Sequence, residues 1–316
     1  MRTILLLFQL KPEQERQIRE LVPDWTIVSG SSENLTSEHY KNAEVVLGWD
    51  SDMLDALNSG CKLKWVQTSS AGVDRLPLAA FKSLGIQLTS ASGIHPVSMA
   101  ETLFAMLLAF SRNLHHAIRN QSEHIWKASE RYYQLSGKTM GIIGVGVIGK
   151  EIARIAGAFG MKTIGVRRDP QPVPGVDKIY AMEQLDEVLS QSDVIVNVLP
   201  YTRETHHLFN SERFGAMRSD ALFFNMGRGS SVDTDALVNA LKNGIIRGAG
   251  LDVFETEPLP GEHPLWTMDN VIITPHIGGW TDQYKQRVTD ILLHNLQAYL
   301  TTGKPDRNVV DYERNY

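Results

Sequence analysis

The sequence predicts an α/β protein built from two doubly wound parallel sheets. Three observations support this fold class. Short apolar runs alternate with helical patterns, one run leads through a glycine loop into an amphipathic helix, and later runs end in polar residues. At 316 residues the chain is long for one hydrophobic core, so we expect two domains.

The composition excludes several classes of function. The formal charge of −5 is spread without blocks, and no basic stripe carries interleaved aromatic residues, so we expect no nucleic-acid partner. Cys61 is the only cysteine, which excludes an intrachain disulfide and fits a reducing, cytoplasmic location. The apolar run Ile4–Phe8 is too short for a signal-peptide core, and no run could span a bilayer, so we expect no membrane association.

The first part of the chain predicts a small α/β domain. Pro12 and Asp50-Ser51 are typical helix-start signals between its apolar runs. Alternation of strands and helices predicts a parallel sheet. The predicted strands are Thr3–Phe8, Thr26–Val28, Val45–Leu47, Trp65–Thr68 and Ile86–Thr89.

The fourth predicted strand is followed by Ser69-Ser70-Ala71-Gly72-Val73-Asp74. Small residues with free backbone N–H groups at the carboxyl end of a parallel strand can hold an anion. A plain glycine turn explains the same pattern equally well.

The next segment leads into the second domain. Met99–Phe110 is apolar on almost every face, which suits a helix buried between domains or between subunits. Arg112–Ser136 mixes charges with Trp126 and two tyrosines and lacks a clear core stripe, so we interpret it as a possible interface arm.

The segment Gly144-Val145-Gly146-Val147-Ile148-Gly149 predicts a dinucleotide-binding turn, because it joins an apolar run to an amphipathic helix. Gly144 permits the turn, Gly146 lets a pyrophosphate approach, and Gly149 lets helix and strand pack closely. The pyrophosphate would lie on the helix N-terminus at Val147 and Ile148. The alternative is a closely packed turn that binds nothing.

The second strand of this domain, Lys162–Val166, ends in Arg167-Arg168. An acid at this position binds the ribose 2′-hydroxyl of NAD, whereas two guanidinium groups suit the 2′-phosphate of NADP. We therefore expect NADP to be preferred, with NAD possible. The alternative is that both arginines are solvated and Asp169 supplies the acid.

Four further strands end in polar residues that a doubly wound sheet brings to one edge. Helical patterns such as Asp233–Lys242 separate them, and the helix Asp282–Leu300 returns the chain to the first domain. The strands are Val194–Leu199, Ala221–Phe224, Gly248–Leu251 and Val271–Ile273, with Pro200, Thr205, Arg228, Asp252, Glu257 and His276 at or after their ends.

These side chains suit the reduction of a ketone by a nicotinamide. His276 could donate the proton, and a carboxylate such as Glu257 beside it favours the imidazolium. Arg228 offers a planar fork for a substrate carboxylate and carbonyl oxygen. Taken alone, each residue also has a purely structural interpretation. The remaining histidine pairs lack partners at metal-ligand spacings, and no Gly-x-Ser-x-Gly elbow occurs, so we expect neither a metal nor a serine hydrolase.

Nearly the whole chain resembles the D-isomer-specific 2-hydroxyacid dehydrogenases. The segments that carry this resemblance are Gly144–Gly149, Leu199-Pro200 with Thr205, Asn225-Met226-Gly227-Arg228-Gly229, Leu251–Pro258 and Thr274-Pro275-His276-Ile277-Gly278-Gly279. The resemblance implies catalysis by Arg228, Glu257 and His276, with Arg228 and His276 also contacting the substrate. It places Pro200, Thr205, Met226 and Asp252 at the cofactor, with Asp252 by the nicotinamide carboxamide, and the Ala71-Gly72 backbone at the substrate carboxylate.

The resemblance also implies an architecture. A Rossmann nucleotide-binding domain (99–284) would be inserted in a discontinuous, flavodoxin-like substrate domain (1–98 plus 285–316), and members are usually homodimers. The expected activity is hydride transfer between NADP(H) and a small 2-oxo acid or (R)-2-hydroxy acid. A dinucleotide-sensing binding protein or corepressor of the same fold remains an alternative. Formate dehydrogenases are expected to pair the histidine with glutamine, where this chain has Glu257.

Overall fold

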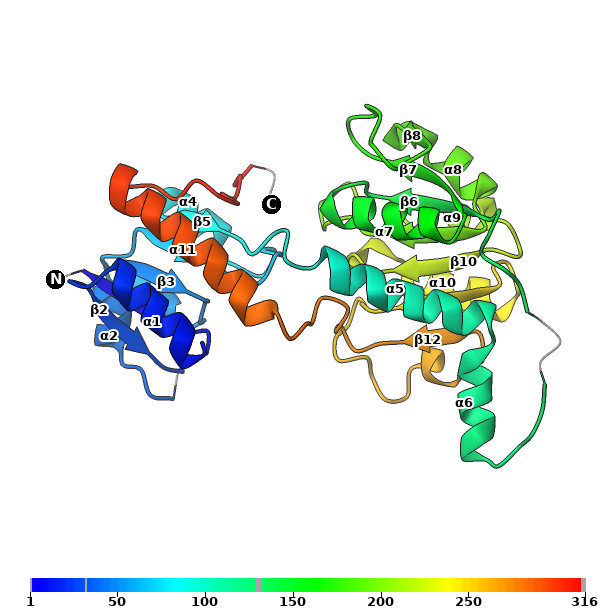
Figure 1. Cartoon of the computed structure of the whole chain (residues 1–316), viewed down its shortest axis with the longest axis horizontal. Coiled ribbons are helices and arrows are strands. Elements are labelled where there is room, and N and C mark those ends of the chain that lie inside the picture. The colour runs from blue at the N-terminus through cyan, green and yellow to red at the C-terminus, as the bar shows by residue number, and fades with distance from the viewer. Residues whose placement is uncertain (1, 32, 129–131, 314–316) are drawn as a thin grey trace. The chain divides into compact units, whose positions relative to one another are not determined.

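The computed structural model describes residues 2–31, 33–128 and 132–313, and the chain forms two compact units (Figure 1). Unit 1 comprises Met1–Ile94 and Thr281–Tyr316, and unit 2 comprises His95–Trp280. The sequence predicted that the chain crosses from one domain to the other after residues 98 and 284. In the structure each change precedes a long helix, so that α5 (Pro96–Ser111) lies wholly in unit 2 and α11 (Tyr284–Thr302) wholly in unit 1.

Unit 1 is a five-stranded parallel sheet in the order β2-β1-β3-β4-β5, the flavodoxin-like order. Its strands are β1 (Thr3–Leu6), β2 (Thr26–Ser29), β3 (Val45–Leu47), β4 (Trp65–Gln67) and β5 (Gln87–Thr89). Besides α11, its helices are α1 (Pro12–Leu21), α2 (Ser37–Asn42), α3 (Met53–Asn58) and α4 (Leu78–Leu84).

Both faces of this sheet are covered because successive strand residues point to opposite sides. Ile4 and Leu6 pack with α1 and α11, whereas Leu5 packs with α2, α3 and α4. The C-terminal segment closes the unit, since the Val310 N–H donates to the Leu88 carbonyl at the edge strand β5. The return of the tail to the first unit follows from these contacts.

Unit 2 is a seven-stranded parallel sheet in the order β12-β11-β10-β9-β6-β7-β8, a Rossmann order extended by one strand. Its strands are β6 (Thr139–Ile143), β7 (Lys162–Val166), β8 (Lys178–Tyr180), β9 (Val194–Asn197), β10 (Leu222–Asn225), β11 (Gly248–Leu251) and β12 (Val271–Ile273). Besides α5, its helices are α6 (Leu114–Ser122), α7 (Val147–Ala158), α8 (Leu185–Gln191), α9 (Ser211–Ala216) and α10 (Thr234–Lys242), with short 3₁₀ turns η1 (Met182–Gln184), η2 (Gly229–Ser231) and η3 (Pro264–Thr267). The predicted fold class is confirmed.

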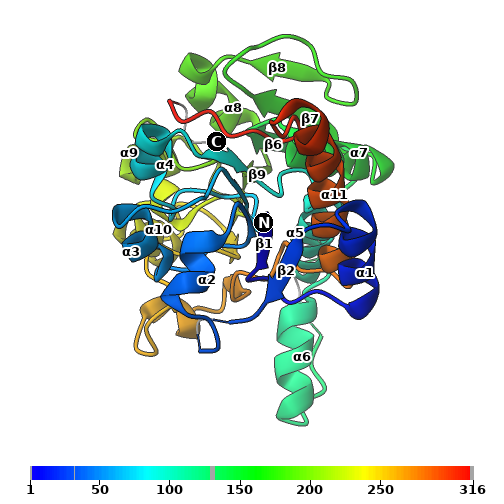
Figure 2. The same ribbon diagram turned by 90° about the vertical axis from the view of Figure 1, so that its left-hand side faces the viewer.

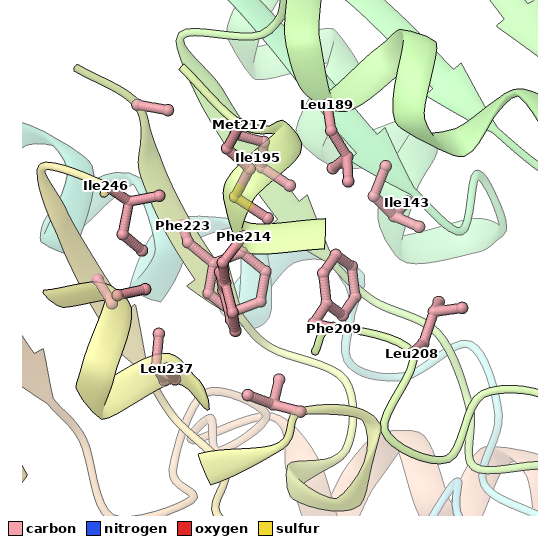
Figure 3. Close-up of a cluster of buried hydrophobic side chains, with 14 of the residues drawn as sticks. Ile143, Leu189, Ile195, Leu208, Phe209, Phe214, Met217, Phe223, Leu237 and Ile246 are labelled. Carbon is pink, nitrogen blue, oxygen red and sulfur yellow. The ribbon is translucent and has the colours of Figure 1, made fainter. Parts of the chain in front are cut away.

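One face of the larger sheet packs against α8, α9 and α10. Phe209, Phe214 and Phe223 lie together at its centre, with ring centroids 4.9 and 5.4 Å apart (Figure 3). The other face packs against α5 and α7. The apolar helix predicted at Met99–Phe110 is therefore buried inside unit 2.

The predicted interface arm contains a helix, α6, that has no buried residue. Asn113, with a left-handed φ of +54°, separates α6 from α5. The helix α6 projects from its unit in both views (Figures 1 and 2). Leu114 and Ile118, one turn apart, are both more than half exposed, and Trp126 is fully exposed. Residues 129–131 of this segment lie outside the described residues.

Candidate nucleotide-binding and catalytic site

The glycine loop lies at the point where the strand order of unit 2 reverses. It follows β6, whose two neighbours are β7 and β9. Open α/β sheets bind ligands outside the carboxyl ends of the strands at such a point. Gly144 has a φ of +105°, and its N–H donates to the Val166 carbonyl at the end of β7. The loop therefore turns tightly over the ends of two strands before α7 begins.

The other two glycines of the loop have different surroundings. A Cβ at Gly149 would lie 2.7 Å from the Gly144 carbonyl oxygen, so only glycine allows this approach of helix and strand. A Cβ at Gly146 would meet no atom within 4 Å, and Gly146 and Val147 are exposed. Among the residues that the structure describes, no side chain caps the first turn of α7. An open approach to uncapped N–H groups at a helix N-terminus fits a pyrophosphate.

Arg167 and Arg168 follow β7 at the same edge of the sheet. Arg167 is half-buried, with its N–H donating to the Tyr180 carbonyl, and Arg168 is exposed. A hydrogen bond from Thr202 lowers the pKa of Glu204, and the positive charge of Arg168 adds to this effect. Arg168 therefore lies near the loop that follows β9.

Two residues of the β9 loop were predicted to bind the cofactor. Pro200 is exposed, whereas Thr205 is 5% exposed. The Thr205 hydroxyl donates to the Pro200 carbonyl over 2.9 Å and accepts from the Thr202 N–H over 2.8 Å. In the structure Thr205 is therefore a buried residue whose hydrogen bonds hold the two ends of this loop together.

Arg228 lies in the loop after β10 and is half-buried. Its Nη1 donates to the Gly227 carbonyl over 2.9 Å. The loop is held closely on two sides, because a Cβ at Gly227 would lie 2.6 Å from the Leu199 carbonyl oxygen and a Cβ at Gly229 would lie 1.9 Å from the Phe254 backbone. The glycines around Arg228 thus allow three loops to pack against one another.

Asp252 directly follows β11 and holds the loop after β12. Its buried carboxylate accepts hydrogen bonds from the Thr274 hydroxyl over 2.6 Å and from the N–H groups of Ile277 and Gly278 over 3.0 Å. The Asp252 carbonyl also accepts from the His276 N–H over 2.9 Å. His276 adopts a φ of +54°, which is uncommon for a residue with a side chain. Asp252 therefore supports the backbone conformation that presents His276.

Glu257 and His276 form the hydrogen-bonded pair that their positions in the sequence predicted. His276 Nδ1 lies 2.9 Å from Glu257 Oε2, while Glu257 Oε1 accepts from the Phe254 N–H over 3.1 Å. An ionised carboxylate only accepts, so Nδ1 carries the hydrogen of this bond. The His276 side chain is 49% exposed, and its Nε2 has no hydrogen-bond partner among the described residues. Nε2 is therefore the atom available to a ligand.

Met226 connects the two loops that carry Arg228 and His276. It is buried, and a Cβ at Gly278 would lie 2.9 Å from its Cε. Of the predicted cofactor residues, Met226, Thr205 and Asp252 are buried parts of the loop framework, whereas Gly146, Val147, Pro200 and Arg168 are exposed.

Ala71 and Gly72 belong to unit 1, in the loop after β4. The Tyr284 hydroxyl of α11 donates to the Ser69 carbonyl, and the Ser70 hydroxyl donates to the Gly72 carbonyl over 2.8 Å. Within the described part of the chain, the N–H groups of Ala71 and Gly72 meet no hydrogen-bond acceptor. Hydrogen bonds from Tyr284 and Ser70 thus hold the loop, and the N–H groups of Ala71 and Gly72 remain available to bind an anion.

A second histidine–glutamate pair was not predicted. His207 Nε2 is hydrogen-bonded to Glu255, which also accepts from the Thr234 N–H at the start of α10 over 2.9 Å. Burial alone would raise the pKa of Glu255, but the hydrogen bonds from Thr234 and His207 lower it. These residues are separated in sequence and share no local spacing that could have identified them.

Two other kinds of site are absent from the described residues. Across residues 2–31, 33–128 and 132–313, no three histidine, cysteine, aspartate or glutamate side chains are placed to hold a metal ion. The same residues contain no helix that is long and apolar enough to cross a membrane.

Comparison with known proteins identifies the family of this chain. Residues 104–278 match the model of the D-isomer specific 2-hydroxyacid dehydrogenase, NAD binding domain. The glyoxylate/hydroxypyruvate reductase B of Escherichia fergusonii is 35% identical to this chain, and the match covers 98% of each protein.

Solved structures extend the similarity to both units. A D-isomer specific 2-hydroxyacid dehydrogenase family protein from Aeromonas salmonicida is 36% identical over 98% of this chain and 99% of that one, with a TM-score of 0.88. The NADPH-dependent glyoxylate/hydroxypyruvate reductase from Sinorhizobium meliloti, solved with NADP and sulfate, is 27% identical over 100% of both chains, with a TM-score of 0.83. Because the named relatives are enzymes, a dinucleotide-sensing binding protein is not favoured. The chain belongs to the D-isomer-specific 2-hydroxyacid dehydrogenase family and is an oxidoreductase that acts on CH–OH donors with a nicotinamide dinucleotide.

Proposed function

We propose that this protein reduces small 2-oxo acids, such as glyoxylate, hydroxypyruvate or a larger analogue, to (R)-2-hydroxy acids with NADPH. The observation that supports this most strongly is the His276–Glu257 hydrogen bond of 2.9 Å at the same sheet edge as the glycine loop and Arg228. Relatives named as glyoxylate and hydroxypyruvate reductases support the choice of substrate class.

Each of the proposed residues has a defined role. A dinucleotide held by the glycine loop would provide the hydride for the carbonyl carbon of the substrate. His276 donates a proton from Nε2 to the carbonyl oxygen, and Glu257 orients the ring through Nδ1 and stabilises its positive charge. Arg228 binds the carboxylate and the carbonyl oxygen, where its charge stabilises the developing alkoxide. In unit 1, the N–H groups of Ala71 and Gly72 are proposed to bind an anion such as a carboxylate.

The direct test is a panel of 2-oxo acids assayed for oxidation of NADPH and NADH by the purified protein. We expect turnover with at least one small 2-oxo acid, and failure with every member of the panel would refute the proposal.

His276→Ala should abolish most turnover and leave the Kd for NADPH within about threefold, because the imidazole acts on substrate and not on the nucleotide. Near-normal catalysis by this variant would remove His276 as the acid.

The preference for NADP is proposed from Arg167 and Arg168. Their place after β7 is where the ribose of a dinucleotide is recognised, and two guanidinium groups suit a 2′-phosphate. Relatives solved with NADPH or NADP are consistent with this choice. Arg167→Asp should shift the ratio of kcat/KM for NADPH over NADH toward NADH by about 10-fold or more. An unchanged ratio would show that Arg167 does not select the nucleotide.

We also propose that the protein is a homodimer that uses α6. An amphipathic helix without a buried residue leaves Leu114 and Ile118 in water, and a second copy would cover them. Ile118→Glu should therefore shift the mass measured by light scattering from dimer to monomer. Leu84→Glu, at an equally exposed position on α4 of unit 1, is the control that should leave the mass unchanged.

A further inference from the structure

Three buried polar side chains lie directly beneath the Arg228 loop. Asn197 is the last residue of β9 and Asn225 the last of β10, and the two are paired in register across the sheet. Ser231 lies in the 3₁₀ turn that follows Arg228. All three residues are at most 1% exposed. Buried amide and hydroxyl groups are costly unless their hydrogen bonds are made.

Every polar atom of the two amides is used. Asn197 Nδ2 donates to Asn225 Oδ1 over 2.9 Å and to Ser231 Oγ over 2.7 Å, and Asn197 Oδ1 accepts from the Leu199 N–H over 3.2 Å. Asn225 Oδ1 also accepts from the Gly227 N–H over 3.2 Å. The network therefore ties the start of the β9 loop to the start of the β10 loop.

The network ends on one atom, the carbonyl oxygen of Arg228. Asn225 Nδ2 donates to this oxygen over 3.0 Å, Ser231 Oγ over 2.6 Å and the Ser231 N–H over 3.2 Å. Three donors on one carbonyl hold the peptide plane of Arg228. A fixed carbonyl limits rotation about the Cα–C bond of Arg228 and so restrains the direction in which its side chain leaves the backbone.

The position of these polar groups indicates a role beyond stability. The other residues of both strands are apolar and fully buried, namely Val194, Ile195, Val196, Leu222, Phe223 and Phe224. An apolar pair at the last position would fill the same layer without the desolvation cost of two amides. A saturated polar network instead specifies one backbone arrangement, and here it does so at the residue proposed to bind substrate.

We propose that Asn197, Asn225 and Ser231 are positioning residues that aim Arg228 at the substrate. This inference rests on the proposed function, because it assigns the network to the substrate-binding arginine. Preorganised groups contribute most to catalysis when their own supports are rigid, and a displacement of about 1 Å can cost about 100-fold in rate.

The test is Ser231→Ala. This substitution removes the hydroxyl that donates to the Arg228 carbonyl and that accepts a hydrogen bond from Asn197 Nδ2. We expect kcat/KM for the 2-oxo acid to fall about 10- to 100-fold, mainly through a higher KM for the 2-oxo acid, with the Kd for NADPH changed by less than about threefold. Ser192→Ala is the matched control, because Ser192 is also fully buried in unit 2 and its hydroxyl donates to the Val188 carbonyl over 2.7 Å. It should lower the melting temperature by a similar amount and leave kcat/KM within about threefold.

A double-mutant cycle separates positioning from general loosening of the loop. In an Arg228→Lys background, Ser231→Ala should add less than about a threefold loss, because the residue it aims is gone. An equal loss in both backgrounds would overturn the proposal. Ser231→Cys keeps a weak donor of similar size and should give an intermediate loss, so it replaces Ser231→Ala if that variant does not fold.

The outcomes distinguish this inference from the proposed function. If the wild-type protein reduces no 2-oxo acid, the proposed function fails and the inference fails with it. If the wild-type protein is active and Ser231→Ala matches Ser192→Ala in kcat/KM, the inference alone is wrong.

Discussion

Replacement of Gly146 by alanine tests the nucleotide site. A Cβ at Gly146 meets no atom within 4 Å, but the backbone at φ −96° and ψ −149° lies outside the regions that alanine ordinarily adopts. We therefore expect the free energy of unfolding to fall by about 1 to 3 kcal/mol through backbone strain, with no steric clash. The same Cβ would stand at the exposed start of α7, where the pyrophosphate is proposed to approach the N–H groups.

The expected loss in affinity follows from those N–H groups. A hydrogen bond to a charged group contributes about 1.5 to 3 kcal/mol, and displacement of the pyrophosphate would lose at least one, so the Kd for NADPH should rise about 10- to 100-fold. Calorimetric titration gives the Kd, and thermal unfolding of the nucleotide-free protein gives the change in stability. Gly157→Ala is the matched control, since Gly157 lies in the same helix with nothing within 4 Å of its Cβ. An unchanged Kd for Gly146→Ala would refute the assignment of this loop.

Three further predictions concern the loop framework, the His276–Glu257 pair and unit 1. Gly149→Ala places a Cβ 2.7 Å from a backbone oxygen and should cost about 2 kcal/mol, seen as a lower melting temperature without nucleotide. Glu257→Gln removes the charge beside the imidazole proposed as the acid and should lower kcat about 10- to 100-fold, with no change in the Kd for NADPH; equal kcat values would contradict this. Burial alone would raise the pKa of Glu44, but hydrogen bonds from Arg2 and Tyr299 lower the pKa below its ordinary value of 4.5. The ionised carboxylate therefore stabilises the fold above pH 4.5, and this stability is lost as the pH falls through the folded-state pKa. In urea unfolding, Glu44→Gln should therefore be less stable by about 2 kcal/mol at neutral pH and approach the wild type below pH 4.5, whereas a pH-independent difference would be contrary to this reasoning.

The hydrogen-bonded pair of His276 and Glu257 could be predicted from sequence because of a property of parallel sheets. Their strands all end at one edge, so residues just after β11 and β12 must come close although Glu257 and His276 are 19 positions apart. The glycine loop was predictable for a similar reason, since its glycines stand between an apolar strand and an amphipathic helix. Both predictions use local patterns together with a rule of topology.

Other features leave no such pattern. Asn197 and Ser231 are 34 positions apart, and an asparagine at a strand end or a serine in a turn is ordinary in either place. The edge strand β8 (Lys178–Tyr180) is three residues long and begins with an exposed lysine, so no alternation marks it. The helix α6 buries nothing in its own unit, and its two large apolar side chains, Leu114 and Ile118, make too short a stripe for hydrophobic periodicity to identify a helix.

The loops that carry the proposed site support one another in series, and this decides how substitutions in them should combine. The β9 loop contacts the β10 loop at Gly227, the β10 loop contacts the β11 loop at Gly229, and Met226 reaches the β12 loop at Gly278. Each loop is therefore part of the packing surface of the next. Substitutions in loops that contact one another should couple, whereas a change in α6 should combine additively with either. The precision of the site is thus a property of the whole sheet edge, and no single strand end could provide it.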